Sequence, residues 1–428
     1  MEGLEWGGVL REAFRRGWPE VQSQVPRRVR EEVERYLRCG DVRYGFVEAT
    51  CTKCQTPRLV ALRCRGRGWC PSCTTRRALE TGLQLEEELP RVAHRQWTLS
   101  LPMRARLLVV KQPGLLKRLE VRLVQAVWRH QRATARRLGA RGALHGGGVC
   151  FWQWFGSSLQ LTPHLHLLVP EVLWTAEGEE VLLPPPGDEE VTALLARVLR
   201  LARRDWGEGD AAWAEDEYEG LQAEALQRPL GLELPASRHR RRRVAVLQGF
   251  SLHADTAVHG HDRAGLGRLC RYGARGPVAE CRLEKLDDGR YRYTPKKGVA
   301  FTVTAAALVK RLVALLPPPR RHLTSFHGVY APNARLRPLV LSSPPPTAEP
   351  PPTPSSPRRQ RQRIDWATLH RRTFGSDVLQ CPCGGRRKVT ALHSTRMAAE
   401  ARLAELRVPC RSLLLPPQTA PPQLSLAV

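Results

Sequence analysis

The sequence predicts an α+β protein in which a cysteine-rich N-terminal domain precedes an antiparallel sheet with flanking helices. The first observation is that six of the twelve cysteines fall within residues 39–73. The second is that β-like segments occur at residues 96–101, 150–155 and 162–170, with an amphipathic helix at 117–137 between the first two. At 428 residues the chain can bury more than one core, so we expect two or three domains.

The segments before and after this predicted sheet have local signals of their own. Apolar residues recur at helical spacing within residues 29–37 and predict a helix near the start. Residues 171–237 contain acidic clusters around a helical stretch at 191–202, which is typical of an insertion. Residues 244–252 then predict another strand.

The last third of the chain continues the alternation of helix and strand. A helix is expected from an N-cap at Asp262 to a stop at Gly276 and Pro277. Further elements follow, namely a strand at 291–301, a helix at 305–316, a proline-rich linker around 344–357 and a short basic helix at 366–374.

We therefore expect four parts. They are an N-terminal domain at 1–90, a central domain at 91–335 with the acidic insertion at 171–237, a proline-rich linker at 336–363, and a small C-terminal region at 364–428.

The charge of the chain predicts a polyanionic partner. The formal net charge is +27 and the pI is about 10.6, with arginine far in excess of lysine. A GC-rich coding bias would explain arginine over lysine, but it would not explain so large an excess over acidic residues. Nucleic acid is therefore the first candidate.

Membrane and secretory signals are missing from the sequence. No run of 18 apolar residues occurs, and residues 1–16 contain charged residues in place of a hydrophobic signal core. We expect a cytoplasmic, nucleoid-associated protein without a membrane partner. Its cysteines are then interpreted as metal ligands or free thiols before disulfides.

Two CxxC pairs in the N-terminal domain have the spacing of a four-sulfur zinc site, and we expect Cys51, Cys54, Cys70 and Cys73 to bind one structural Zn²⁺. A redox role is the competing interpretation, but the arginines between the pairs favour a DNA-facing zinc knuckle. Cys39 and Cys64 could form a second or expanded site; we favour buried thiols for both.

His164 and His166 lie two residues apart in an apolar segment. In a strand, such residues share a face, so both imidazoles would point the same way and offer half of a metal site. The alternative is a pair of strand histidines that face solvent or are satisfied by neighbours.

The helix after Asp262 places Arg268, Tyr272 and Arg275 at i, i+4 and i+7, with Arg271 beside them. Guanidinium groups could bind a phosphodiester and favour the phenolate, whose oxygen could then attack phosphorus. The alternative is a half-buried core tyrosine next to solvated arginines.

These motifs, in this order, resemble those of the HUH rolling-circle nucleases: a strand with a small polar run (97–100), the His-Leu-His strand (164–166) and a later tyrosine helix (272–275). More closely, the chain resembles the zinc-binding rolling-circle insertion-sequence transposases, which comprise a two-tyrosine family and its single-tyrosine relatives. The segments that carry this resemblance are 37–41, 64–77, 95–102, 155–170, 249–254, 269–277, 327–334 and 366–385.

The resemblance implies a DNA transposase with an HUH-nuclease-like sheet. His164 and His166 would bind a catalytic Mg²⁺ or Mn²⁺, with Gln153 as third ligand and His253 as the alternative. Tyr272, assisted by Arg275, would cut one DNA strand and keep its 5′ end as a phosphotyrosine.

The same resemblance implies the partners. Arg268 and Arg271 would contact single-stranded DNA from the element ends and the target. The host replication machinery is a further partner, and neither a nucleotide cofactor nor a small-molecule substrate is expected.

Two departures from the family pattern stand out. Arg268 occupies the position one turn before Tyr272, where two-tyrosine members have their second tyrosine. Cys381 and Cys383 are separated by one residue, one fewer than the family usually has, so we expect no C-terminal zinc site. The competing functions are a plasmid replication initiator or relaxase, and a non-catalytic zinc-dependent DNA-binding protein.

Overall fold

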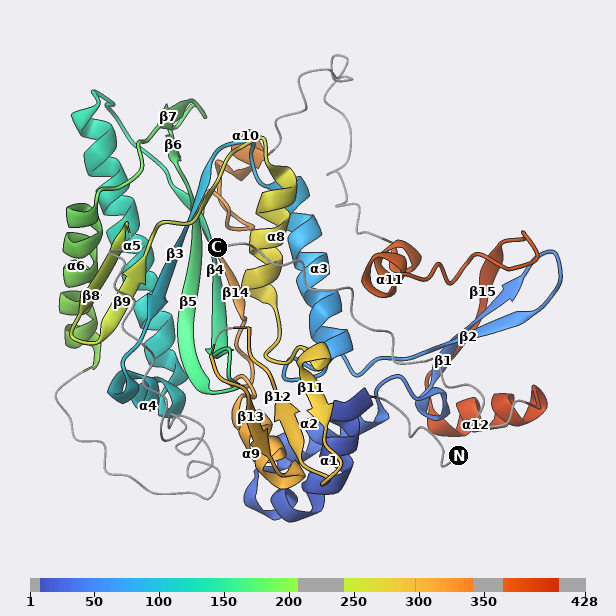
Figure 1. Cartoon of the computed structure of the whole chain (residues 1–428). Coiled ribbons are helices and arrows are strands. Elements are labelled where there is room, and N and C mark those ends of the chain that lie inside the picture. The colour runs from blue at the N-terminus through green and yellow to red at the C-terminus, as the bar shows by residue number, and fades with distance from the viewer. Residues whose placement is uncertain (1–7, 207–241, 297, 342–364, 408–428) are drawn as a thin grey trace.

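The computed structural model describes residues 8–206, 242–296, 298–341 and 365–407 (Figure 1). The fold is α+β, as predicted. Its centre is an antiparallel sheet in the order β14-β4-β5-β3-β9-β8, and β10 pairs with β3. The strands are β3 (His94–Ser100), β4 (Gly147–Phe155), β5 (Leu161–Pro170), β8 (Val244–Leu247), β9 (Phe250–His253), β10 (Ala257–Val258) and β14 (Thr324–Gly328).

Helices cover both faces of this sheet (Figure 1). One face packs against α5 (Pro113–Arg137) and α6 (Asp188–Trp206) through a large apolar core that includes Trp152, Leu165 and Leu167. The other face packs against α3 (Pro71–Glu88) and α8 (Arg263–Ala274) through a second core that includes Phe151 and Leu168. Because neighbours in a strand alternate between faces, Phe151 and Trp152 belong to different layers.

Part of the predicted acidic insertion belongs to the core. Its described residues form β6 (Val172–Trp174), β7 (Glu180–Leu182) and α6. The apolar stripe of α6 is buried, with Val191, Leu195 and Val198 all fully inaccessible. The helical stretch predicted at 191–202 is therefore part of α6, and this helix packs against α5 and β8. The acidic cluster at 215–219 and the arginines at 238–241 lie outside the described residues.

The remaining helices around the central sheet and a small three-stranded sheet complete this part of the fold. They are α1 (Gly8–Val21), η1 (Gln22–Gln24), α2 (Arg27–Arg38), α4 (Met103–Lys111), η3 (Glu280–Arg282), β11 (Leu283–Lys285), β12 (Tyr291–Tyr293), β13 (Phe301–Val303), α9 (Ala305–Ala314) and α10 (Arg337–Leu341). The predicted strand at 291–301 is instead a hairpin of β12 and β13, and β12 buries Tyr291 and Tyr293. None of the helices in the described parts of the chain is long and apolar enough to cross a membrane.

A second sheet joins the two ends of the chain. It has the order β15-β1-β2, from β1 (Phe46–Cys51), β2 (Pro57–Ala61) and β15 (Arg387–His393). Near it lie η2 (Val42–Tyr44), α11 (Trp366–Phe374) and α12 (Arg396–Glu405). The helix predicted at 366–374 is therefore present, while the C-terminal region contributes a strand to the N-terminal sheet. The predicted division into domains stays a prediction.

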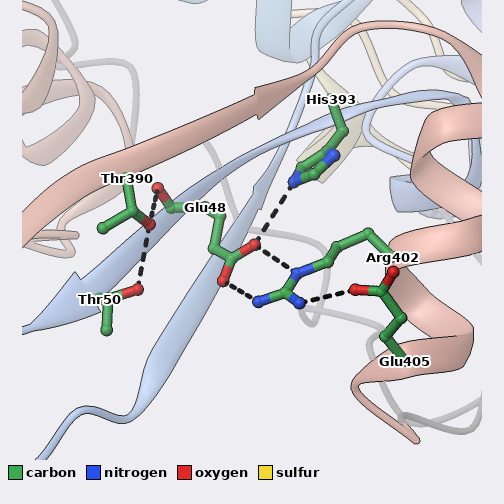
Figure 2. Close-up of polar contacts among 6 residues, drawn as sticks. All are labelled: Glu48, Thr50, Thr390, His393, Arg402 and Glu405. Atoms are coloured by element: carbon green, nitrogen blue, oxygen red, sulfur yellow. Dashed lines mark hydrogen bonds and ion pairs between the residues drawn. The ribbon is translucent and has the colours of Figure 1, made fainter.

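A buried carboxylate holds α12 against this sheet (Figure 2). Glu48 on β1 is 4% exposed and accepts two hydrogen bonds from Arg402, at 2.9 Å and 2.8 Å. The imidazole of His393 lies 3.4 Å from the same carboxylate. The hydrogen bonds from Arg402 lower the pKa of Glu48 against the opposing effect of burial, so the carboxylate stays charged.

We predict that Glu48→Gln weakens the docking of the C-terminal strand. Without the buried carboxylate, Arg402 keeps only its exposed partner Glu405, so we expect a lower opening free energy and faster exchange of the β15 amides. Native-state hydrogen exchange measures this quantity.

Glu405→Gln is the matched control, because Glu405 pairs with the same arginine from an exposed position at the end of α12. We expect at most about 0.5 kcal/mol from this change. Equal effects of the two variants would show that the burial of Glu48 is irrelevant to docking.

Candidate active site and cysteine clusters

The two predicted metal histidines lie on the central strand of the sheet, on the face covered by α8. In the strand register, His164 is opposite Gln153 of β4 and Ser100 of β3. His166 is opposite Phe151 and Thr98. The two imidazole centroids are 4.8 Å apart. The sheet therefore brings both histidines and Gln153 to one face, as the sequence predicts.

Hydrogen bonds orient each imidazole. Nδ1 of His164 lies 2.7 Å from the carbonyl oxygen of Thr162, so Nδ1 carries the proton and Nε2 has a free lone pair. Nδ1 of His166 lies 3.0 Å from the hydroxyl of Thr98, while its Nε2 is buried without a hydrogen-bond partner. Nε2 of His164 is thus available for a ligand, and Nε2 of His166 has no protein partner.

Burial keeps both imidazoles neutral. It lowers the pKa of His164 to about 4, and the nearby Arg275 acts in the same direction. Burial also lowers the pKa of His166 well below its usual value, helped by His164 and Arg275. A neutral imidazole is the form that binds a metal ion.

The side-chain amide of Gln153 donates hydrogen bonds to α8 through its nitrogen and keeps its oxygen without a protein partner. Its Nε2 donates hydrogen bonds to the carbonyl oxygens of Tyr272, at 2.7 Å, and Gly273, at 3.0 Å. These carbonyls belong to the last turn of α8, where no intrahelical donor is available. Its Oε1 is buried without a hydrogen-bond partner. An amide oxygen is a suitable ligand for Mg²⁺ or Mn²⁺.

The alternative third ligand, His253, lies on β9 opposite Thr98, one strand further away. Within the described residues, only the two cysteine clusters bring three or more His, Cys, Asp or Glu ligand atoms within 4.8 Å of one another. His253 therefore does not complete a cluster with His164 and His166, and Gln153 is the better candidate.

Tyr272 lies beside this histidine pair. Its ring centroid is 5.6 Å from that of His166, edge to face. With 37% exposure, Tyr272 is the one exposed tyrosine among those the structure describes. The adjacent Gly273 lets α8 approach the sheet, because a Cβ there would lie 2.6 Å from the ring of Phe151.

Arg275, the residue after the end of α8, places its guanidinium over the ring of Tyr272. α8 ends at Ala274, and Arg275 follows in an extended conformation as the C-cap. Its guanidinium carbon lies 4.8 Å from the centroid of the Tyr272 ring and 5.1 Å from that of Phe155. Its Nε is buried without a hydrogen-bond partner. This cation therefore stands next to the phenol.

The other two predicted arginines lie along the same helix. Arg268 is partly exposed and lies 3.6 Å from Asp262, the N-cap of α8. Arg271 packs its side-chain stem near Gly82 of α3. Both are therefore placed along α8, whereas the guanidinium of Arg275 lies over the Tyr272 ring.

The first cysteine cluster consists of Cys39, Cys64, Cys70 and Cys73. The sulfur–sulfur distances are 3.7 Å for Cys39–Cys70, 3.8 Å for Cys39–Cys73 and 3.5 Å for Cys64–Cys73. A tetrahedral ion with metal–sulfur bonds of about 2.3 Å has sulfur–sulfur edges of about 3.8 Å. The cluster therefore fits one zinc ion.

The second cluster consists of Cys51, Cys54, Cys381 and Cys383. The predicted single site of Cys51, Cys54, Cys70 and Cys73 is thus wrong, as is the preference for Cys39 and Cys64 as simple buried thiols. Spacing predicts which cysteines form a pair, but not which pairs meet. Cys70 and Cys73 lie with Cys39 and Cys64. Cys51 and Cys54 lie with Cys381 and Cys383.

Sequence reasoning missed a buried polar group on the opposite face of the sheet. Glu120 of α5 is fully buried and accepts hydrogen bonds from Lys117 and from the indole of Trp152, while His327 lies 2.5 Å away. The signal was a single acid within the apolar stripe of the helix at 117–137. These contacts identify Trp152 as a core residue.

The chain matches two family models. Residues 13–101 match a family described as "Transposase zinc-binding domain". Residues 147–337 match one described as "Putative transposase". No curated protein and no solved structure matches the chain. The first cysteine cluster falls entirely within the zinc-binding match, which identifies it as a structural zinc site.

We predict that the buried histidines make stability fall as the pH decreases. A histidine in the unfolded chain binds a proton near its ordinary pKa of 6.5, whereas the pKa of folded His164 is lowered to about 4. Stability is then intact above pH 6.5 and decreases toward pH 4, by up to about 1.4 kcal/mol per pH unit for each such group.

The test compares urea unfolding of wild type and His164→Gln across that window, without added divalent ions. The variant should show a shallower pH slope, while His261→Gln, at an exposed position, should match wild type. An unchanged slope in His164→Gln would refute the neutral buried state.

Proposed function

This chain belongs to the zinc-binding insertion-sequence transposases of the two-tyrosine HUH type, and we propose that it nicks and rejoins single-stranded DNA at the ends of its element by a rolling-circle route. The family makes it a DNA-cleaving, DNA-binding enzyme. The finer proposal rests on one observation above all. An exposed tyrosine stands between a buried histidine pair and a guanidinium, as expected of a nucleophile at a phosphodiester.

The proposed chemistry is phosphoryl transfer to Tyr272. The phenolic oxygen attacks phosphorus, the bond from phosphorus to the 3′ oxygen breaks, and the 5′ end remains as a phosphotyrosine. The phenol gives up its proton as it attacks, and the leaving 3′ oxygen takes up a proton. The phosphodiester energy is conserved in the new bond, so a new 3′ hydroxyl can reverse the attack without a nucleotide cofactor.

Arg275 is the cation closest to the proposed nucleophile. Its guanidinium carbon lies 4.8 Å from the Tyr272 ring centroid. The same charge would stabilise the negative charge that develops on the phosphate oxygens. Arg268 and Arg271 would bind the neighbouring backbone phosphates, consistent with a net charge of +27.

His164, His166 and Gln153 would hold the divalent ion. When bound, Mg²⁺ or Mn²⁺ supplies Lewis-acid polarisation of the scissile phosphate. The buried and unpartnered atoms at this place, Nε2 of His166 and Oε1 of Gln153, support this assignment. The hydrogen bond from His164 to Thr162 fixes the tautomer that leaves Nε2 as a ligand.

The position of a second nucleophile is occupied by Arg268. We therefore propose that cutting and rejoining alternate at the single tyrosine of α8. This distinguishes the chain from members that transfer a strand between two tyrosines on one helix.

We predict that Tyr272→Phe abolishes the covalent adduct with labelled single-stranded oligonucleotides from the element ends. Loss of a nucleophile should reduce adduct formation on the order of a thousandfold or more. Denaturing gels with Mg²⁺, and with EDTA as a blank, measure this.

Tyr44→Phe is the matched control, since Tyr44 is partly exposed but lies in the terminal sheet region. It should form adduct like wild type. An adduct that persists in Tyr272→Phe would place the nucleophile elsewhere. If wild type binds DNA but forms no adduct with any divalent ion, the chain is a DNA-binding protein without this activity.

We predict that His166→Ala weakens Mn²⁺ binding at least tenfold and removes divalent-dependent cleavage, while single-stranded DNA binding stays within about twofold of wild type. Electron paramagnetic resonance of free Mn²⁺ measures the affinity independently of activity. His261→Ala, in an exposed histidine of the loop before α8, should change neither quantity. Equal Mn²⁺ affinity in His166→Ala and wild type would exclude this histidine as a ligand.

A further inference from the structure

Four cysteines from opposite ends of the chain converge at the edge of the terminal sheet. Cys51 ends β1, Cys54 lies in the turn after it, and Cys381 and Cys383 lie in the loop before β15. We propose that these four thiolates bind a second zinc ion, separate from the one in the first cysteine cluster, and that this ion locks the C-terminal segment onto the hairpin of β1 and β2.

The sulfur geometry fits a tetrahedral ion. All four sulfurs lie within 4.8 Å of one another. Cys51 and Cys383 are 3.6 Å apart, as are Cys54 and Cys381. These values are close to the edge of about 3.8 Å expected around zinc. The backbone N–H of Lys53 donates to the sulfur of Cys51 at 3.4 Å, which stabilises a thiolate.

The loop that carries Cys381 and Cys383 has a backbone conformation that suits a zinc site. Cys381 and Gly385 form a backbone hydrogen bond of 3.0 Å, and Gly384 donates to Cys381 at 3.0 Å. Gly385 must lack a side chain, because a Cβ would lie 2.8 Å from the sulfur of Cys51 and 3.3 Å from that of Cys383. The glycine keeps open the space where the sulfurs meet.

The site closes one end of the β1–β15 ladder. Cys51 is paired with Arg387 at this end, and Phe46 is paired with His393 at the other. The far end is held by the Glu48–Arg402 ion pair and a small apolar cluster that includes Phe46 and Leu403. In between, Thr50 and Thr390 share a hydrogen bond of 3.0 Å (Figure 2).

Packing alone holds β15 weakly. Val389 is 56% exposed and Leu392 62%, so this strand itself buries little apolar surface. A saturated four-sulfur site contributes its binding free energy directly to the folded state. The docking of β15 is therefore metal-dependent, whereas the first cluster, which lies in the main core, supports the central fold.

The first test is the zinc content of the full-length protein by native mass spectrometry. Wild type should hold two zinc ions per chain, and the double variant Cys381→Ser/Cys383→Ser should hold one. Gly385→Ala should also lose one ion. Cys281→Ser and Gly114→Ala are the controls, at an exposed thiol and an uncrowded glycine, and should keep two.

The second test needs no variant, so it does not depend on mutant folding. Cys54, Cys281 and Cys383 are all exposed thiols. In zinc-loaded wild type, iodoacetamide should label Cys281 at least tenfold faster than the other two, as read by peptide mass spectrometry. Chelator should remove that difference. The proposal is wrong if Cys383 reacts as fast as Cys281 with zinc present. It is also wrong if the protein as purified has disulfides among these four cysteines and no zinc bound to them.

The third test locates the effect. In Cys381→Ser/Cys383→Ser, hydrogen exchange of β15 amides should accelerate at least tenfold, while β5 amides stay as protected as in wild type. Unchanged β15 protection would overturn the locking role. Adduct formation at Tyr272 is measured in the same samples, so failure of this proposal is separable from failure of the proposed nuclease function.

Discussion

The candidate site depends on the side-chain amide of Gln153, which fixes a helix end to the sheet. Its Nε2 donates to the carbonyl oxygens of Tyr272 and Gly273, two groups that the end of α8 leaves without helical donors. Each such group costs about 1–3 kcal/mol when it is buried and unpaired. The amide thereby determines where Tyr272 lies relative to the histidines on β5, and its oxygen remains available on the same face.

Close packing of α8 against the sheet and against α3 further fixes the position of Tyr272. Gly273 brings α8 against the ring of Phe151, and Gly267 lies where a Cβ would meet the carboxylate of Glu86 on α3. The helix ends at Ala274, so Arg275 returns over the tyrosine ring and does not project one turn further along the helix. The sequence predicted that these residues share a face; termination of the helix is what brings the guanidinium so close.

Local patterns predicted this molecule well, and long-range pairing was the part they could not supply. The His-x-His spacing, the Asp262 cap and the helix at 366–374 follow from neighbours in sequence, and all are present. Which cysteine pairs meet depends on closing a loop of roughly 300 residues, for which spacing has no signal. Composition also misled: the acidic clusters around the helical stretch at 191–202 indicated an insertion, whereas the apolar stripe of α6 packs on α5 within the core.

The first zinc site supports the helix that carries Tyr272 through the packing of α3 on α8. Cys70 and Cys73 lie at the start of α3, so the first zinc site holds the N-terminus of that helix. Further along, α3 packs closely on α8, because a Cβ at Gly82 would lie 2.9 Å from the carbonyl oxygen of Gly267. Zinc therefore supports α3, α3 supports α8, and α8 presents Tyr272. A metal site without a role in the chemistry thus sets the position of the residue that we propose performs it.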